Sequence, residues 1–196
     1  SICIAIAMHM LENLDCAMTY SETQKCIMFI NGEYWEHCFM SEKYSDNFFQ
    51  SRYGIDKDDV EIVKVGLRTA DVIEDMKTTG FADVMEFMQK QDFSNPDNYA
   101  ALQKMIDVQS YIDFIAGNII ICNMDYDENK NFLVFKSNKT NGSGWNDGLW
   151  RWGYYDMDLL TWEMLYDSSF RDTYGVSEDW EIDPFTMRPL WVEHAT

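Results

Sequence analysis

Two stretches of the chain concentrate oxygen-bearing side chains of the kind that bind metal ions. Residues 122–136 read CNMDYDENKNFLVFK and place four of them just ahead of an apolar run: Asp125, Asp127, Asn129 and Asn131. Residues 150–160 read WRWGYYDMDLL, a strand-like run that ends on Asp156 and Asp158. Carboxylate and amide oxygens suit hard cations such as Mg²⁺ and Ca²⁺. If the two stretches are the arms of one hairpin, these groups can converge on one ion.

An EF-hand calcium loop explains the first stretch poorly. Asp125, Asp127 and Asn129 match the first three ligand positions of such a loop. The sixth position should be glycine and is Lys130, and the twelfth should be glutamate and is Lys136. The sequence therefore argues against an EF-hand.

The order of parts also matches phosphoryl transfer by protein kinases. There, a catalytic-loop Asp accepts the hydroxyl proton, an Asn a few residues later holds magnesium, and an Asp at the end of a hairpin holds magnesium against the ATP phosphates. Spacing alone leaves plain turn chemistry open, because Asp and Asn are ordinary turn residues. A glycoside hydrolase is a further alternative, since two carboxylates among aromatic residues can act across one bond. It would use Asp125 with Asp156 or Asp158, and it gives Asn131 no role.

The elements that must position these residues are expected to be helices and strands in mixed order. Apolar residues at near-helical spacing predict a helix over residues 2–19. Asn31-Gly32 between two apolar runs predicts a β-hairpin, because a type I′ turn needs positive φ at both central residues. The next expected elements are a helix between Ser45 and Gly54, a strand over residues 58–66, a helical segment over residues 69–91 broken near Gly80, and a helix starting at Pro96.

The last expected helix leads directly to the acidic stretch. It begins at the cap residue Asp107, carries one apolar stripe that ends at Cys122, and delivers the chain to Asn123. The elements that follow are a strand over residues 131–137, a Gly- and Asn-rich turn over residues 138–148, and a returning strand over residues 149–158.

Composition narrows the class of protein. With 46% hydrophobic residues, the 196-residue chain can bury the core of one domain. The net charge of −19 disfavours a nucleic-acid partner, which would require a basic surface. Five scattered cysteines without a CxxC pair indicate small buried side chains with reduced thiols rather than a zinc site. No apolar run is long enough to span a membrane, and no basic segment marks a signal peptide.

Three blocks of sequence resemble the CotH kinase family, the atypical kinases named after a bacterial spore coat protein. They are INGEYW with SEKYSDNFFQSRYGIDKDDVEIVK, SYIDFIAGNIIICNMDYDENKNFLVFK, and GLWRWGYYDMDLL, and the resemblance is strongest over residues 27–160. It implies an α+β, atypical protein-kinase-like fold, with helices around small antiparallel sheets. Residues 1–196 are then expected to form a single CotH kinase-like domain, incomplete at its N-terminus because the family's Gly- and Lys-rich upstream region is not in the chain.

The resemblance also implies a reaction: phosphoryl transfer from ATP, with Mg²⁺, to a Ser or Thr of a protein substrate. A spore coat or an extracellular or cell-surface location would follow from family habit. The alternative is a non-catalytic surface or coat module whose acidic hairpin binds calcium or nothing.

Site residues follow from the same resemblance. The family's Asn-x-Asp falls on Asn123 and Asp125, which makes Asp125 the expected catalytic residue. Asn131 is the expected metal ligand after it, and Asn129 is the second choice, expected to contact the cofactor. After Trp152, the family's two acids fall on Asp156, the magnesium ligand, and Asp158, a supporting ligand.

A second family motif falls on the first expected hairpin. Its residues match at Asn31, Gly32 and Tyr34, and its final acid falls on Glu42. Glu42 is expected to help bind the cofactor by anchoring a lysine. Glu36 stands where the family has a second glycine. No lysine can be placed on the phosphates from sequence.

Overall fold

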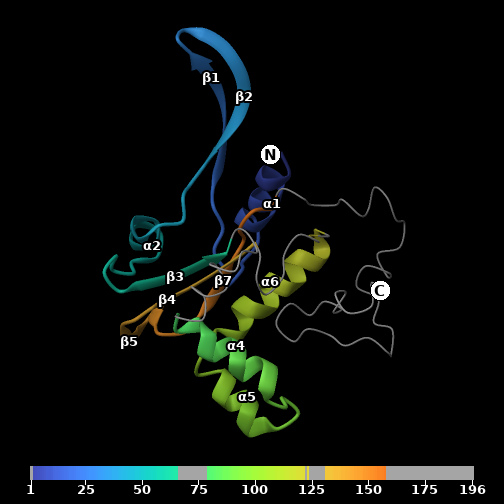
Figure 1. Cartoon of the computed structure of the whole chain (residues 1–196), viewed down its shortest axis with the longest axis vertical. Coiled ribbons are helices and arrows are strands. Elements are labelled where there is room, and N and C mark those ends of the chain that lie inside the picture. Colours follow the sequence, from blue (N-terminus) through green and yellow to red (C-terminus); the bar gives the residue numbers. More distant parts are fainter. Residues whose placement is uncertain (1, 66–78, 122, 124–130, 158–196) are drawn as a thin grey trace, which may run out of the picture.

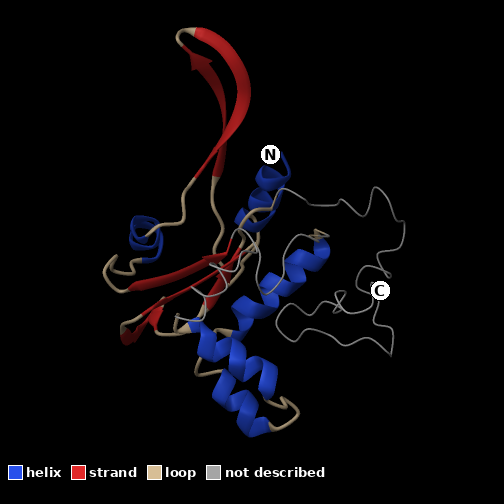
Figure 2. Cartoon of the chain, viewed as in Figure 1, coloured by secondary structure: helices blue, strands red, loops and turns tan. Residues whose placement is uncertain are grey.

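The computed structural model describes residues 2–65, 79–121, 123 and 131–157. Within these residues the chain is mixed α+β, with helices around small antiparallel sheets (Figure 1, Figure 2). The helices are α1 (Ile2–Glu12), α2 (Asp46–Tyr53), α4 (Phe81–Lys90), α5 (Pro96–Leu102) and α6 (Val108–Ile120). The strands are β1 (Thr23–Ile30), β2 (Glu33–Ser41), β3 (Val60–Val65), β4 (Phe132–Ser137), β5 (Thr140–Ser143), β6 (Asn146–Asp147) and β7 (Arg151–Gly153).

A three-stranded antiparallel sheet in the order β3-β4-β7 lies at the centre of the fold. Strand β3 runs against β4 with Val65 opposite Phe132. Strand β7 runs against the other edge of β4 with Leu133 opposite Gly153. The predicted hairpin between the two acidic stretches is thereby confirmed.

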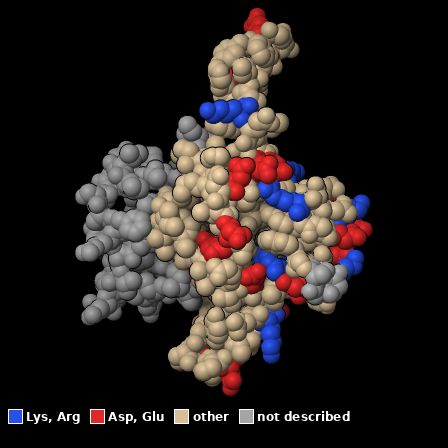
Figure 3. Space-filling view, turned by 180° about the vertical axis from the view of Figure 1, so that it is seen from behind, with Lys and Arg blue, Asp and Glu red and all other residues tan. Residues whose placement is uncertain are grey.

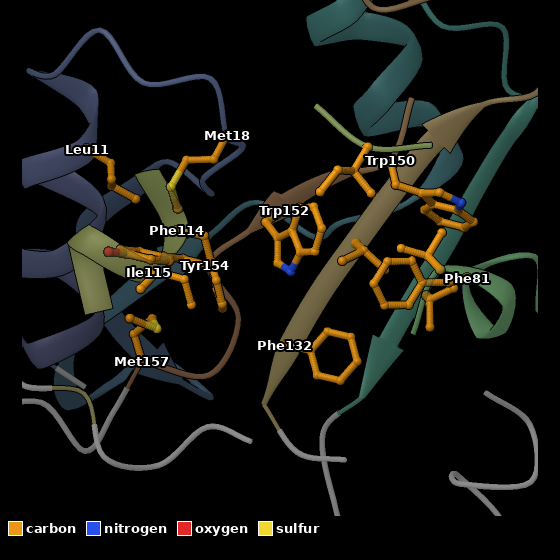
Figure 4. Packing of buried hydrophobic residues seen from close by; sticks show 14 of the residues in the cluster. Leu11, Met18, Phe81, Phe114, Ile115, Phe132, Trp150, Trp152, Tyr154 and Met157 are labelled. Atoms are coloured by element: carbon orange, nitrogen blue, oxygen red, sulfur yellow. The ribbon is translucent and has the colours of Figure 1, made fainter. Parts of the chain in front are cut away.

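Strand β4 is apolar on both faces because each face is covered. Successive side chains of a strand point to opposite sides. Phe132 and Val134 pack in a cluster with Phe81 of α4 and with apolar residues of α1 and α6. Figure 4 shows this side of the sheet, where the Phe81 ring centroid lies 5.1 Å from that of Trp150 and 5.8 Å from that of Trp152. On the other side, Leu133 and Phe135 pack against the aromatic residues of α2.

The hairpin of β1 and β2 projects from the rest of the fold (Figure 1). Asn31 and Gly32 both have positive φ, 54° and 85°, as the predicted type I′ turn requires. Large apolar side chains are exposed along the hairpin: Ile27, Phe29, Ile30, Tyr34, Trp35 and Met40. Figure 3 shows that uncharged side chains cover most of this projection, whereas charged groups are more frequent on the body.

The capping residues inferred from sequence hold their helices as predicted. Ser45 Oγ accepts the Phe48 N–H at 3.4 Å, and Gly54 ends α2 in the left-handed region. Asp107 Oδ1 accepts the Ser110 N–H at 3.2 Å at the start of α6.

Three predicted boundaries are wrong. The first helix ends at Glu12 rather than residue 19, because Thr19 pairs with β7: its N–H donates to the Trp152 carbonyl at 3.0 Å. The turn over residues 138–148 contains the small hairpin β5–β6. The returning strand is confined to β7, so the acid-bearing residues after Gly153 lie beyond it. Residues 66–78, which include part of the helical segment predicted over residues 69–91, lie outside the described residues.

No helix in the described ranges combines the length and the apolar character that crossing a membrane requires.

Arg151 joins β7 to two other elements. Its Nε donates to Asp107 Oδ2 at 3.0 Å, at the start of α6, and its Nη1 donates to Asp147 Oδ1 at 2.9 Å, in β6. The guanidinium also lies 4.7 Å from the centroid of the Trp145 ring. Arg151 is buried while both carboxylates are half-buried, so the group fixes how β7 sits against α6.

Replacing Arg151 with Ala is expected to lower the free energy of unfolding by about 2–3 kcal/mol near neutral pH, because two partly buried carboxylates lose their partner. Burial alone would raise the pKa of Asp147, but the hydrogen bonds from Arg151 and from the Leu149 N–H outweigh it, and the pKa is lowered. A carboxyl group with a lowered pKa stabilises the fold at pH values above its ordinary pKa of about 3.9. This contribution is lost as the pH falls through the pKa of the folded state.

Urea unfolding of both proteins at about pH 7 and about pH 3 checks this prediction, and the difference between them should narrow at the acid pH. Arg151→Lys keeps the charge without the forked geometry and should fall between the two. Equal unfolding free energies at neutral pH would show that the ion pairs contribute nothing.

Candidate functional site

Two of the predicted metal ligands, Asn131 and Asp156, lie at one end of the central sheet. Strand β4 begins just after Asn131, and β7 ends just before the segment that carries Asp156. Because Leu133 lies opposite Gly153, the antiparallel register brings Asn131 beside the residues that follow β7. The end of β3 lies there too, with Val65 opposite Phe132. We call this place the Asn131 end of the sheet.

Asn131 and Asp156 share an unusual backbone conformation. Their φ angles are 54° and 56°, and Asn31 in the hairpin turn is the third non-glycine residue with positive φ in the described part of the chain. Asn and Asp tolerate this region better than other side chains. Asn131 is 2% exposed, whereas Asp156 faces solvent. The site therefore offers a buried amide and an accessible carboxylate, held by backbone shapes that cluster at functional sites.

A buried amide network ties the end of α6 to the segment after β7. Asn118 Nδ2 donates to the Phe114 carbonyl at 2.8 Å, and Asn118 Oδ1 accepts from Asn123 Nδ2 at 2.8 Å. Asn123 Nδ2 also lies 3.4 Å from the sulfur of Met157. Asn118 and Asn123 are 0% and 1% exposed, so each hydrogen bond is shielded from water. The residue two before Asp125 is thus fixed beside the residue that follows Asp156.

Two further contacts hold the segment after β7 in place. Tyr44 Oη donates to the Tyr154 carbonyl at 2.8 Å, and burial raises the pKa of the Tyr44 hydroxyl well above its usual value, so it remains a neutral donor. Helix α6 approaches closely at Gly117, where an added Cβ would lie 1.9 Å from Tyr154 Oη. Figure 4 shows Tyr154 and Met157 packed among side chains of α6.

Lys64 brings a cation to the same end of the sheet. It precedes the last residue of β3, and its Nζ lies 5.6 Å from the centroid of the Tyr155 ring. Burial raises the pKa of the Tyr155 hydroxyl, and the neighbouring Asp156 carboxylate adds to the effect. The Lys64 side chain is exposed, and its contact with the Tyr44 carbonyl is long, at 3.5 Å. Its ammonium group can therefore turn to an anionic ligand.

Glu42 has a different partner from the lysine that the sequence suggested. Its Oε2 accepts from Arg52 Nη1 at 2.7 Å and from the Glu22 N–H at 3.0 Å. Arg52 Nη2 also donates to Glu22 Oε1 at 2.9 Å, and its guanidinium lies 4.5 Å from the centroid of the Tyr20 ring. In this arrangement Glu42 joins the end of β2 to α2. Its role in cofactor binding stays a prediction.

Three predicted site residues, Asp125, Asn129 and Asp158, lie outside the described residues. In the part of the chain that the structure describes, no group of three or more His, Cys, Asp or Glu side chains could hold a metal ion. Of the predicted metal ligands, the Asp156 carboxylate and the Asn131 amide lie in that part. The described residues therefore neither complete the predicted magnesium site nor contradict it.

Sequence reasoning missed Asn118 and Met157, and it interpreted Lys64 as a solvated strand or loop lysine. Asn118 left a signal, because it is an amide three residues after Ile115, within the apolar stripe of α6. An amide on a buried helix face needs a buried partner. Met157 and Lys64 gave no such signal in the sequence, since each comes into contact with its neighbours only when β3, β4 and β7 pair.

Comparison with known proteins bears on the identity of this site. A family model described as CotH kinase protein matches residues 5–194, nearly the whole chain. No curated protein matches the sequence.

Proposed function

We propose that the chain, which belongs to the CotH kinase family, is a protein kinase that uses the Asn131 end of the sheet as its active site. There it would transfer the γ-phosphoryl group of ATP to a Ser or Thr hydroxyl of a protein substrate. ATP use follows from kinase family membership; magnesium, the acceptor and the residue roles are the finer parts of the proposal. The observation that carries it is the convergence of Asn131, Asp156 and the anchored Asn123 on one end of an antiparallel hairpin.

The residues at this end fit a magnesium–nucleotide complex. Asp156 supplies an exposed carboxylate and Asn131 an amide, and both offer the oxygen donors that Mg²⁺ prefers. Magnesium, when bound, neutralises charge on the transferring phosphoryl group. Asp156 and Asn131 would hold the ion, with Asp158 as a supporting ligand and Asn129 and Glu42 as further cofactor contacts. The chain would then have an atypical protein-kinase-like fold.

Asp125 has the role of the base in this proposal. It follows Asn123 by two residues, and the Asn123–Met157 contact holds the start of that segment next to Asp156. From there Asp125 would orient the acceptor hydroxyl and take its proton as the phosphoryl group transfers. Lys64 would place a positive charge beside the phosphates, since its Nζ lies over Tyr155 next to Asp156. A coat or surface protein is the acceptor class that family habit favours.

A transfer assay tests the proposal. The chain is incubated with γ-labelled ATP, Mg²⁺ and dephosphorylated casein, and label on Ser or Thr is identified by mass spectrometry, with a chelator as the blank. Lys64→Ala should raise the KM for ATP about tenfold, through the loss of one charge-assisted phosphate contact. Lys104→Ala, another exposed lysine, should leave it unchanged. Chelator-resistant labelling, or equal KM values for the two variants, would contradict the proposed roles.

A further inference from the structure

Two cysteines face each other across the projecting hairpin. Cys26 of β1 and Cys38 of β2 are direct register partners. Their sulfur atoms lie 3.1 Å apart, and Cys26 Sγ also lies 3.6 Å from the Cys38 carbonyl oxygen. Directly opposed residues of an antiparallel pair have Cβ atoms close to the separation that a disulfide requires. The two thiols are therefore arranged for bonding without movement of the strands.

A β-bulge produces this pairing. Near the turn, Ile30 lies opposite Glu33 and Phe29 opposite Tyr34. The register then shifts by one residue, so that Met28 lies opposite Glu36 and Trp35 is the extra residue of the bulge. Without the shift Cys26 would face His37, and the two sulfur atoms would lie on opposite faces of the hairpin. This is why the spacing of the cysteines gave no sign of the pair.

The surroundings of the two thiols differ from those of Cys16. Both are half-buried on a hairpin that shares no strand with the central sheet. The pKa of the Cys38 thiol is raised, first of all by its hydrogen bond with Cys26. By contrast, burial raises the pKa of the Cys16 thiol, and the carboxylates of Asp113 and Asp15 add to the effect.

We propose that Cys26 and Cys38 form a reversible disulfide that closes the β1–β2 hairpin. The oxidant is a low-molecular-weight disulfide. One protein thiolate attacks it, forms a mixed disulfide and releases one small thiol. The second protein thiolate then attacks the cysteine sulfur of this mixed disulfide, forms the Cys26–Cys38 bond and releases the second small thiol. The protein loses two electrons and two protons, and the oxidant gains them as two thiols.

The hairpin has a physical reason to carry such a bond. A two-stranded hairpin is marginally stable by itself, and this one exposes large apolar side chains instead of burying them. A cross-link at Cys26 and Cys38 restricts the unfolded states of the turn and of the residues around the bulge. The oxidised hairpin would be a stiffer projection than the reduced one.

Tryptic mapping tests the bond directly, because cleavage after Lys25 and Lys43 releases both cysteines in the peptide of residues 26–43. The full chain is treated with oxidised glutathione, alkylated under denaturing conditions and digested. We expect this peptide to carry no alkyl group and to be lighter than the reduced peptide by two hydrogen atoms. If the oxidised chain is reduced before alkylation, this peptide should again carry two alkylated cysteines. Two alkyl groups after oxidation, or stable glutathione on both cysteines, would overturn the proposal.

Matched variants and hydrogen exchange complete the test. Cys38→Ser should trap glutathione on Cys26, whereas Cys16→Ser should leave formation of the bond unchanged. Oxidation should slow amide exchange in the wild-type β1–β2 hairpin and should have no such effect in Cys38→Ser. Faster exchange on oxidation would mean that the bond distorts the native hairpin, which would also overturn the proposal.

Discussion

Replacing Asp125 with Ala is expected to lower phosphoryl transfer by on the order of 100- to 10,000-fold, the usual contribution of a general base. Binding of magnesium and ATP should change little, because the proposed metal ligands remain. Asn123, two residues earlier, is held by Asn118 and contacts Met157, so the backbone before Asp125 is anchored independently of the Asp125 side chain. The loss should therefore fall on kcat rather than on nucleotide affinity.

Asp127→Ala is the matched control for this prediction. It removes the same charge from the same stretch of sequence, and it should leave transfer within a small factor of wild type. Single-turnover transfer and nucleotide titration, measured on both variants, separate chemistry from binding. If Asp127→Ala is as damaging as Asp125→Ala, the stretch contributes its overall charge and Asp125 is not the base.

Replacing Gly153 with Ala is expected to lower the free energy of unfolding by about 3 kcal/mol, because a fully packed site cannot accept another carbon. A Cβ on Gly153 would lie 2.3 Å from Thr19 Cγ2, 2.8 Å from Leu133 Cδ2 and 3.1 Å from the Thr19 carbonyl oxygen. Thr19 and Leu133 are each 0% exposed, and the Thr19 backbone is hydrogen-bonded to Trp152 and Tyr154 on either side of Gly153. None of these neighbours has room to withdraw.

Gly80→Ala supplies the control. There the nearest atoms are Glu61 Oε1 at 3.3 Å, Glu61 Oε2 at 3.4 Å and Lys136 Nζ at 3.5 Å, the ends of flexible side chains. Its cost should be about 0.5 kcal/mol or less, because Gly80 has right-handed helical backbone angles, φ −62° and ψ −14°, which Ala adopts without strain. Thermal and urea unfolding of the two variants check the difference. Equal stabilities would mean that β7 does not pack against Thr19 and β4 as described.

Features decided within a few residues could be predicted from sequence. The Asn31-Gly32 turn and the caps at Ser45 and Asp107 follow from local backbone and hydrogen-bond preferences, and each is confirmed. The predicted first helix is too long, because the apolar spacing through Met18 does not reveal that Thr19 pairs with β7. A partner far along the chain outweighed local periodicity there.

The same division applies to the site. Convergence of Asn131 and Asp156 followed from the expected hairpin, and the β4–β7 register confirms that the two stretches pair. The side-chain partners could not be foreseen: Glu42 meets Arg52 rather than a lysine, and Asn123 meets Asn118 and Met157. Such contacts depend on how α2, α6 and β7 are placed, which no short spacing encodes. The roles of the site residues stay predictions.

Calorimetric titration of the chain with ATP, with and without Mg²⁺, tests the proposed nucleotide site most directly. Asp156→Ala is titrated beside it, with Asp97→Ala, an exposed acid in the first turn of α5, as the charge-matched control. We expect binding that requires magnesium in the wild type and in Asp97→Ala, and its loss in Asp156→Ala. Magnesium-dependent binding of equal affinity in Asp156→Ala would contradict a metal–nucleotide site at the Asn131 end of the sheet.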